Sequence, residues 1–168
     1  MGAHSKLVQM ISNENLQAIN NIPIVSDFVR RYGFDGVNCH GAYVLYNSTY
    51  AIIIFDALAD DGLEILLLNL KTGFRHPATR IEGFCTESGI LDVKELLSHR
   101  SKSTDSVDGI FLSHGKKKTA GLYDAFMSLN IVFPDLINTS PELAALADKV
   151  DSSWMRPYIA CIEAARNK

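Results

Sequence analysis

Hydrophobic residues gather in three short runs between positions 42 and 71, and clusters of polar turn residues separate these runs. Short apolar runs bounded by turn residues are typical of strands joined by hairpins. The pattern therefore predicts central strands at 42–46, 50–58 and 63–71. The second and third runs do not alternate with polar residues, so both faces of these strands should be covered by helices. The sequence predicts an α+β fold with a mainly antiparallel sheet flanked by helices.

Helical spacing of apolar residues marks the segments around this sheet. A helix is predicted from Pro23, with an apolar stripe that includes Val25 and Phe28, and Gly33 is placed to end it. Later apolar stripes predict helices at 122–129 and 141–150, and Pro157 is expected to begin the last helix. Residues 34–36 are interpreted as a turn. Short strands are predicted at 107–112 and 131–133 and, with its pairing left open, at 80–85.

Composition limits the protein class. The chain has 168 residues, 47% hydrophobic and 21% charged, which is typical of a single globular domain spanning 1–168. The net charge of −3 gives no overall attraction to nucleic acid or anionic membrane. No apolar run approaches the roughly 18 residues of a membrane-spanning helix, so no membrane partner is expected. Residues 1–5 are interpreted as disordered or tag-derived.

The three cysteines, Cys39, Cys85 and Cys161, are an odd number at wide spacing and contain no C-x-x-C pair. Neither a disulfide framework nor a zinc knuckle is predicted from this pattern, and a cytoplasmic, reducing location is favoured. Cys39 with His40, and His76 or His114 as a remote base, is a weak candidate for nucleophilic catalysis. Adjacent residues on an extended strand point to opposite faces, which argues against His40 serving Cys39.

A basic loop is the first candidate binding site. Residues 113–119 are expected to join a strand to a helix, which places three lysines at the opening turn of the helix. Free backbone N–H groups at such a position bind anions. The sequence therefore predicts a possible phosphate, nucleotide or nucleic-acid contact, with a solvated surface loop as the alternative. The candidate residues are Ser113, His114, Lys116, Lys117, Lys118 and Thr119.

Carboxylates at one end of the predicted sheet form the second candidate. Asp56 follows a buried run, Asp60 and Asp61 lie in the next turn, and Lys71 ends the following strand. The order of helix, three strands, helix, strand and helix over about residues 13–130 is similar to the core of restriction-endonuclease-like nucleases. This resemblance implies Asp56 as a Mg²⁺ or Mn²⁺ ligand, Lys71 as the motif lysine and Glu14 as an optional ligand. Asn69 stands where that family has a carboxylate.

None of the candidate sites combines a nucleophile, a base and a group that orients the base. None of them supplies a complete set of metal ligands. The preferred interpretation is therefore a non-enzymatic protein without a cofactor, which binds a protein partner as an interaction, inhibitor or immunity-type protein. Its suspected surfaces are the turn with Asp60 and Asp61 and the loops at 98–106 and 113–119. The alternatives are a metal-dependent phosphodiesterase or nuclease, and an anion- or nucleotide-binding module.

Overall fold

One antiparallel sheet runs through the middle of the protein. A computed structural model describes residues 17–56, 63–92, 94 and 115–168. Within these residues, six strands pair in sequence order, each antiparallel to the next, which confirms the predicted α+β class and sheet type. The strands are β1 (Asp35–Cys39), β2 (Ala42–Tyr46), β3 (Tyr50–Asp56), β4 (Leu63–Asn69), β5 (Phe74–Pro77) and β6 (Asp148–Lys149).

The three predicted central strands are confirmed as β2, β3 and β4. In β3 and β4, Tyr50 lies opposite Asn69 and Asp56 lies opposite Leu63. An asparagine shapes the turn at each of two strand ends. Asn47 Oδ1 accepts hydrogen bonds from the amides of the next turn, and Asn69 Oδ1 accepts from Lys71 N at 2.9 Å. β4 therefore ends at Asn69, and the predicted strand end at residue 71 lies in the turn.

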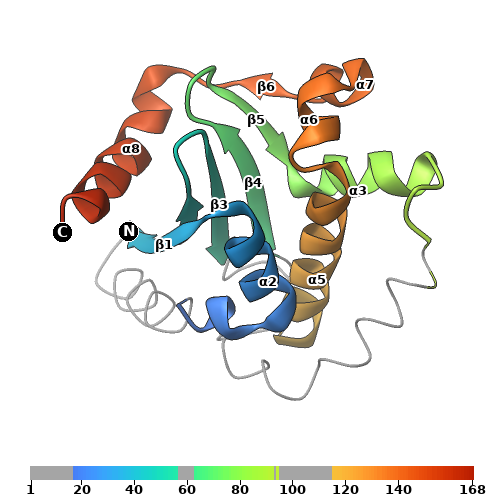
Figure 1. Cartoon of the computed structure of the whole chain (residues 1–168), viewed down its shortest axis with the longest axis horizontal. Coiled ribbons are helices and arrows are strands. Elements are labelled where there is room, and N and C mark those ends of the chain that lie inside the picture. Colours follow the sequence, from blue (N-terminus) through green and yellow to red (C-terminus); the bar gives the residue numbers. More distant parts are fainter. Residues whose placement is uncertain (1–16, 57–62, 93, 95–114) are drawn as a thin grey trace, which may run out of the picture.

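Helices cover both faces of the sheet, as the absence of alternation predicts (Figure 1). On one face, alternate residues such as Leu45, Ile52 and Leu67 pack against the first group of helices. On the opposite face, Val44, Ile53 and Leu68 pack beneath α8 (Ser152–Arg166). The first group comprises the 3₁₀ helix η1 (Gln17–Asn21), α2 (Pro23–Tyr32), α3 (Ala78–Glu87), α5 (Gly115–Val132), α6 (Asp135–Thr139) and α7 (Pro141–Ala145).

The helix predicted from Pro23 is confirmed as α2. Pro23 occupies its first turn, where no backbone N–H is needed, and Gly33 ends it with a left-handed φ of 68°. Val25 and Phe28 are fully buried against the first face of the sheet. Phe28 also stacks on Phe34 at a ring distance of 5.5 Å, which ties the end of α2 to the start of β1.

Two elements near the sheet differ from the sequence prediction. The expected turn at 34–36 is largely strand β1, an edge strand whose exposed residues gave no apolar signal. Gly36 is required there because a Cβ would collide with the Tyr43 ring on β2. The short strand predicted at 80–85 is wrong, because these residues belong to α3. Ala78, Ile81 and Cys85 are its buried positions, which follow helical spacing, and the added strand is instead β5.

Three predictions in the second half are also wrong in detail. Residues 131–132 end α5 instead of forming a strand, because the helix continues until Pro134 removes a backbone donor. The helix predicted to span 141–150 ends at Ala145 and is followed by β6. Pro157 lies inside α8, which begins at Ser152 because the Asp151 carboxylate accepts from Trp154 N at 2.8 Å.

Cys39 and Cys161 form a disulfide, with Cα atoms 6.0 Å apart, so the expectation of no disulfide is wrong. The bond joins the end of β1 to α8 across a sequence separation of 122 residues. The wide spacing hid this pairing, because the sheet and α8 bring the two positions together only in the folded chain. Cys85 is the buried free cysteine among the described residues.

Several predictions lie outside the described residues: the segment 1–5, the strand at 107–112 and the end of the strand predicted at 50–58. Among the residues that the structure describes, no helix has both the length and the apolar character needed to cross a membrane.

Removing the disulfide should lower the free energy of unfolding. Closing a long loop restricts the unfolded chain, so replacing both cysteines with serine, Cys39→Ser with Cys161→Ser, should cost about 2–4 kcal/mol. Urea titrations followed by circular dichroism measure this change. The oxidised wild type should lose similar stability on adding a reductant, whereas the double variant should not respond. Equal midpoints for all four samples would contradict a stabilising disulfide.

Candidate functional site

Asp56 and Lys118, taken from two separate sequence candidates, form one buried ion pair. Lys118 Nζ lies 2.5 Å from Asp56 Oδ1, and the two side chains are 0% and 2% exposed. Asp56 is the last residue of β3, while Lys118 lies in the first turn of α5. The pair therefore fastens α5 to the end of the central strand. The two opposite charges neutralise each other inside the protein, where a ligand from solution does not reach them.

The residue set implied by the nuclease resemblance is not brought together. Lys71 lies beyond Asn69, which is opposite Tyr50 at the other end of β3 from Asp56. At a rise of about 3.3 Å per residue, Asp56 and Lys71 are separated by about 20 Å along the hairpin. Asn69, at the position of the family's carboxylate, uses its side-chain oxygen to hold the turn. Glu14, Asp60 and Asp61 lie outside the described residues.

From Gly115 onward, the described part of the basic segment is helical and not a loop. α5 begins at Gly115, so Lys117, Lys118 and Thr119 lie in its opening turn. Lys117 is exposed, whereas Lys118 and Thr119 are buried. Lys118 therefore does not offer a charge to a surface anion. Ser113 and His114 lie outside the described residues, and the side chain of Lys116 is not described, so their predicted anion contact stays a prediction.

The proposed thiol chemistry at Cys39 is not supported, because its sulfur is bonded to Cys161. His76 is also remote from it. Cys39 lies on β1 and His76 on β5, with three strands between them in the sheet. With strands spaced about 4.8 Å apart, the two residues are separated by nearly 20 Å. His114 lies outside the described residues.

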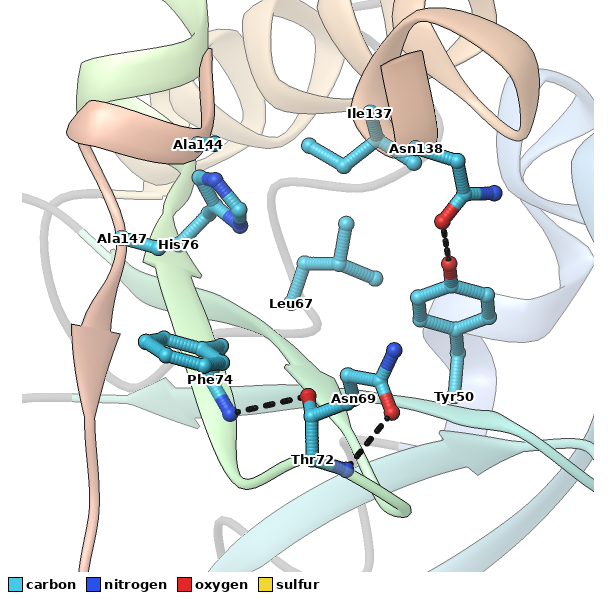
Figure 2. A pocket seen from close by; sticks show the side chains of 10 residues that line it. All are labelled: Tyr50, Leu67, Asn69, Thr72, Phe74, His76, Ile137, Asn138, Ala144 and Ala147. Carbon is cyan, nitrogen blue, oxygen red and sulfur yellow. Dashed lines mark hydrogen bonds between the residues drawn. The ribbon is translucent and has the colours of Figure 1, made fainter. Parts of the chain in front are cut away.

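A pocket of about 200 Å³ opens between the sheet and the α6–α7 segment (Figure 2). Its lining is mostly apolar. Tyr50, Asn69 and Asn138 form a polar edge, and His76 lies across the pocket from Tyr50 and Asn138. Among the described residues that line it, none has a lysine, arginine or carboxylate side chain. These residues are Tyr50, Leu67, Asn69, Thr72, Phe74, His76, Ile137, Asn138, Ala144 and Ala147.

The polar side of the pocket is held by hydrogen bonds. The Tyr50 hydroxyl donates to Asn138 Oδ1 at 2.5 Å, and Asn138 Nδ2 donates to Pro134 O at 2.6 Å. Thr72 N donates to Asn69 Oδ1 at 3.1 Å. Figure 2 shows the amide nitrogen of Asn69 turned towards the pocket, away from Thr72. This arrangement presents a donor from Asn69 and an acceptor lone pair from Tyr50 beside an apolar wall.

His76 is the histidine of the pocket, and its surroundings favour the neutral ring. Its Nε2 lies 2.7 Å from the carbonyl oxygen of Leu143, so Nε2 carries the hydrogen and donates. Burial lowers the pKa of His76 below its ordinary value, although the bond to Leu143 acts in the opposite direction. The neutral ring anchors the α7 segment to β5. Because its Nε2–H already donates to Leu143 O, the ring is poorly suited to give a proton to a ligand as a general acid.

Sequence reasoning missed this pocket because its parts come from three distant segments. β4 and β5 supply Asn69 and His76, and α6 supplies Asn138. From sequence, Asn69 stands out only as a departure from a metal motif, and Tyr50 is either a cross-strand partner within the sheet or part of an aromatic surface. His76 is a candidate from sequence only as a remote base for Cys39, and its burial at the end of β5 becomes visible only in the fold.

Comparisons of this chain with known protein families, with curated proteins and with solved structures found no match. The geometry of the described residues is therefore the basis for the function proposed below.

Breaking the buried ion pair should destabilise the fold strongly. Lys118→Met leaves the Asp56 carboxylate buried without its cation, which should cost about 3–5 kcal/mol of unfolding free energy. The double variant Asp56→Leu with Lys118→Met should recover most of this loss, because no charge then remains buried. Urea unfolding measures both changes.

The matched control is the exposed pair of Asp27 and Arg30, whose side chains are 62% and 79% exposed. Asp27→Ala should change stability by less than about 1 kcal/mol, because solvent screens this pair. A loss for Lys118→Met as small as that for Asp27→Ala would mean that the buried pair does not hold α5 to the sheet.

His76 should make the fold less stable in mild acid. Its pKa is lowered in the folded state from an ordinary 6.5, so the unfolded chain binds the proton more readily. Stability should be full above about pH 6.5 and should fall as the pH drops below that value. Urea midpoints at about pH 7.5 and 5.5 should differ less in His76→Gln than in the wild type. An unchanged difference would assign the acid sensitivity to other groups.

Proposed function

We propose that this protein is a non-enzymatic binding protein of the interaction, inhibitor or immunity type. Its binding site is the pocket between β3–β5 and the α6–α7 segment, which accepts one uncharged, ring-sized side chain of a protein partner. The observation that carries this proposal is a pocket of about 200 Å³ with apolar walls and a fixed polar edge. Concave apolar pockets with a few convergent polar groups are the usual form of binding sites.

The size of the pocket supports an anchor side chain. A cavity of about 150 Å³ holds one benzene molecule, so 200 Å³ accommodates a single substituted ring. Single aromatic residues that fill such pockets provide much of the affinity in protein interfaces. The uncharged lining favours a neutral group, because a charged one would lose its hydration without gaining an opposite charge. The Asn69 amide and the Tyr50 oxygen suit a polar tip such as a phenol.

The surroundings of the pocket support a protein partner over a free metabolite. Phe74 lines the pocket and is 42% exposed, which is unusual for so large an apolar side chain. Lys149 lies over its ring at 5.8 Å. Ala144 is also exposed on α7, beside the same pocket. A partner that inserts one side chain would also cover this exposed apolar surface, which a small molecule inside the pocket would leave in water.

The pocket offers little for catalysis. Its histidine uses Nε2 to bond a carbonyl, and no cysteine or carboxylate lines it in the part of the chain that the structure describes. The suspected partner surface at Asp60 and Asp61 stays a prediction, as does a cytoplasmic location. The disulfide weakens the argument for that location, because such bonds persist mainly in oxidising compartments.

Ring compounds that mimic side chains test this proposal. p-Cresol and toluene, the side-chain equivalents of Tyr and Phe, should bind the wild type, whereas the charged ring of benzoate should bind more weakly. Ala144→Trp should weaken p-cresol binding by at least about tenfold, or 1.4 kcal/mol, because the indole occupies the pocket. The matched control is Ala145→Trp, the next residue of α7, which is exposed and does not line the pocket. NMR titration measures all three proteins.

The same variants distinguish a protein partner from a small ligand. A protein captured by the wild type and by Ala145→Trp, but not by Ala144→Trp, would support the anchor side chain. Binding of p-cresol that is equal in both variants would place the ring elsewhere and overturn the assignment of the pocket. If Ala144→Trp loses a low-molecular-weight ligand but captures proteins as the wild type does, the pocket is a small-molecule site instead.

A further inference from the structure

Three soft metal-ligating groups meet where β1 turns into β2. The sulfur atoms of Cys39 and Cys161 and a ring nitrogen of His40 all lie within 4.8 Å of one another. Cys39 is buried, Cys161 is half-buried on α8, and His40 is exposed to solvent. The cluster is therefore open on one side. It stands at the β1 edge of the sheet, away from the pocket on β4 and β5.

The backbone at His40 explains why neighbouring residues serve one site. His40 and Gly41 form the two-residue turn between β1 and β2, with φ angles of 48° and 87°. Both values lie in the left-handed region, as in the tight turns that join hairpin strands. Adjacent side chains alternate between faces only on an extended chain. The left-handed turn at His40 breaks that alternation and brings its imidazole to the side of Cys39.

α8 is held on the sheet by contacts other than the disulfide. Met155 and Ile162 are buried against Val44, Ile53 and Leu68 of the sheet. Arg166 donates to Asn47 O at 2.6 Å and lies over the Tyr46 ring at 5.5 Å. None of these contacts involves a cysteine. Cys161 should therefore stay close to Cys39 when the bond between them is reduced.

We propose that reduction of the Cys39–Cys161 disulfide creates a Zn²⁺ site. Cys39, His40 and Cys161 supply three protein ligands, and water supplies the fourth. A dithiol reductant transfers two electrons and two protons to the S–S bond, which yields two thiols, and the dithiol becomes a disulfide. Zn²⁺ then displaces both thiol protons to solvent and forms two Zn–S bonds. Two thiolates with one imidazole are a ligand set that Zn²⁺ favours.

The ligand distances require only local movement. Tetrahedral zinc with Zn–S bonds of about 2.3 Å and a Zn–N bond of about 2.0 Å places its ligand atoms about 3.5–3.8 Å apart. The two sulfur atoms must separate from bonding distance, and the imidazole must close in from its present range of up to 4.8 Å. Rotation of the Cys39, His40 and Cys161 side chains is enough for such shifts. The surface position of His40 leaves the metal an entry path.

Cobalt provides the test, because Co²⁺ bound by thiolates absorbs light whereas free Co²⁺ barely does so. The full chain is reduced with a phosphine under nitrogen, passed through a desalting column and titrated with Co²⁺ and then Zn²⁺. The reduced wild type should develop thiolate-to-cobalt absorption that saturates at one Co²⁺ per chain. Zn²⁺ should displace the cobalt and abolish this absorption. The oxidised wild type should show none of it.

Variants assign the ligands. His40→Asn keeps a residue that tolerates the left-handed turn but removes the imidazole, so Co²⁺ binding should weaken by at least about tenfold. Cys39→Ser with Cys161→Ser should abolish the absorption, and Cys85→Ser should leave it unchanged. Circular dichroism of each reduced variant verifies that the fold persists.

Three results from the wild type and His40→Asn would overturn the proposal, and one from Cys85→Ser would do the same. The first three are a reduced, folded wild type that binds no Co²⁺ or Zn²⁺, equal binding before and after reduction, and Co²⁺ affinity in His40→Asn equal to that of the wild type. A loss of absorption in Cys85→Ser as large as in the double serine variant would also overturn it, by moving the metal to another cysteine.

Discussion

The burial of both faces of the central hairpin is the constraint on which the other elements depend. Ile52 and Ile53 are neighbours in β3, point to opposite faces and are both fully buried. A strand of this kind needs a covering layer on each side. On one side the cover comes from helices that precede β1 or lie between β5 and β6 in sequence. On the other it comes from α8 alone among the described helices, so the second face depends on how firmly α8 is docked (Figure 1).

Specific bonds between distant residues fix each covering layer in addition to apolar contact. Hydrophobic burial is not directional, and a helix on a flat apolar face can rotate or slide at little cost. The ion pair of Asp56 and Lys118 fixes the start of α5 against β3, and the bond of Cys39 to Cys161 fixes α8 against β1. Both bonds connect residues far apart in sequence. Together they define where the two outer layers sit relative to the same sheet.

The parts of the fold that could be predicted are those with a local signal. α2 and the hairpins of β2, β3 and β4 were found because hydrophobic spacing and turn residues lie within a few positions of each other. β1 is an exposed edge strand, and α3 buries only one stripe of a largely polar segment. The composition of these two segments therefore does not identify them as a strand and a helix. Pro157 is typical of a helix start, but the stronger signal for the start of α8 is Asp151, whose side chain caps the helix six residues earlier.

The candidate sites were harder to predict than the fold because a site is a contact between distant segments. Asp56 and Lys118 were each singled out for their charge, but no pattern in the sequence indicates that the two neutralise each other. The pocket has the same origin, since Tyr50 and Asn138 become partners only when α6 packs over β3. A charged residue beside an apolar run therefore has two explanations from sequence, a ligand site or a buried pair.

The turn at His40 shows how a rule valid for one backbone conformation can mislead at its boundary. Cys39 and His40 face opposite ways only where the chain is extended through both residues. The strand ends at Cys39, and one left-handed residue is enough to place the imidazole beside the two sulfur atoms. Gly41 was the available signal, because a glycine directly after a polar residue at a strand end is typical of a tight hairpin turn. A tight turn at His40 and Gly41 predicts that the Cys39 and His40 side chains lie together. The position of Cys161 beside them follows only from the folded structure.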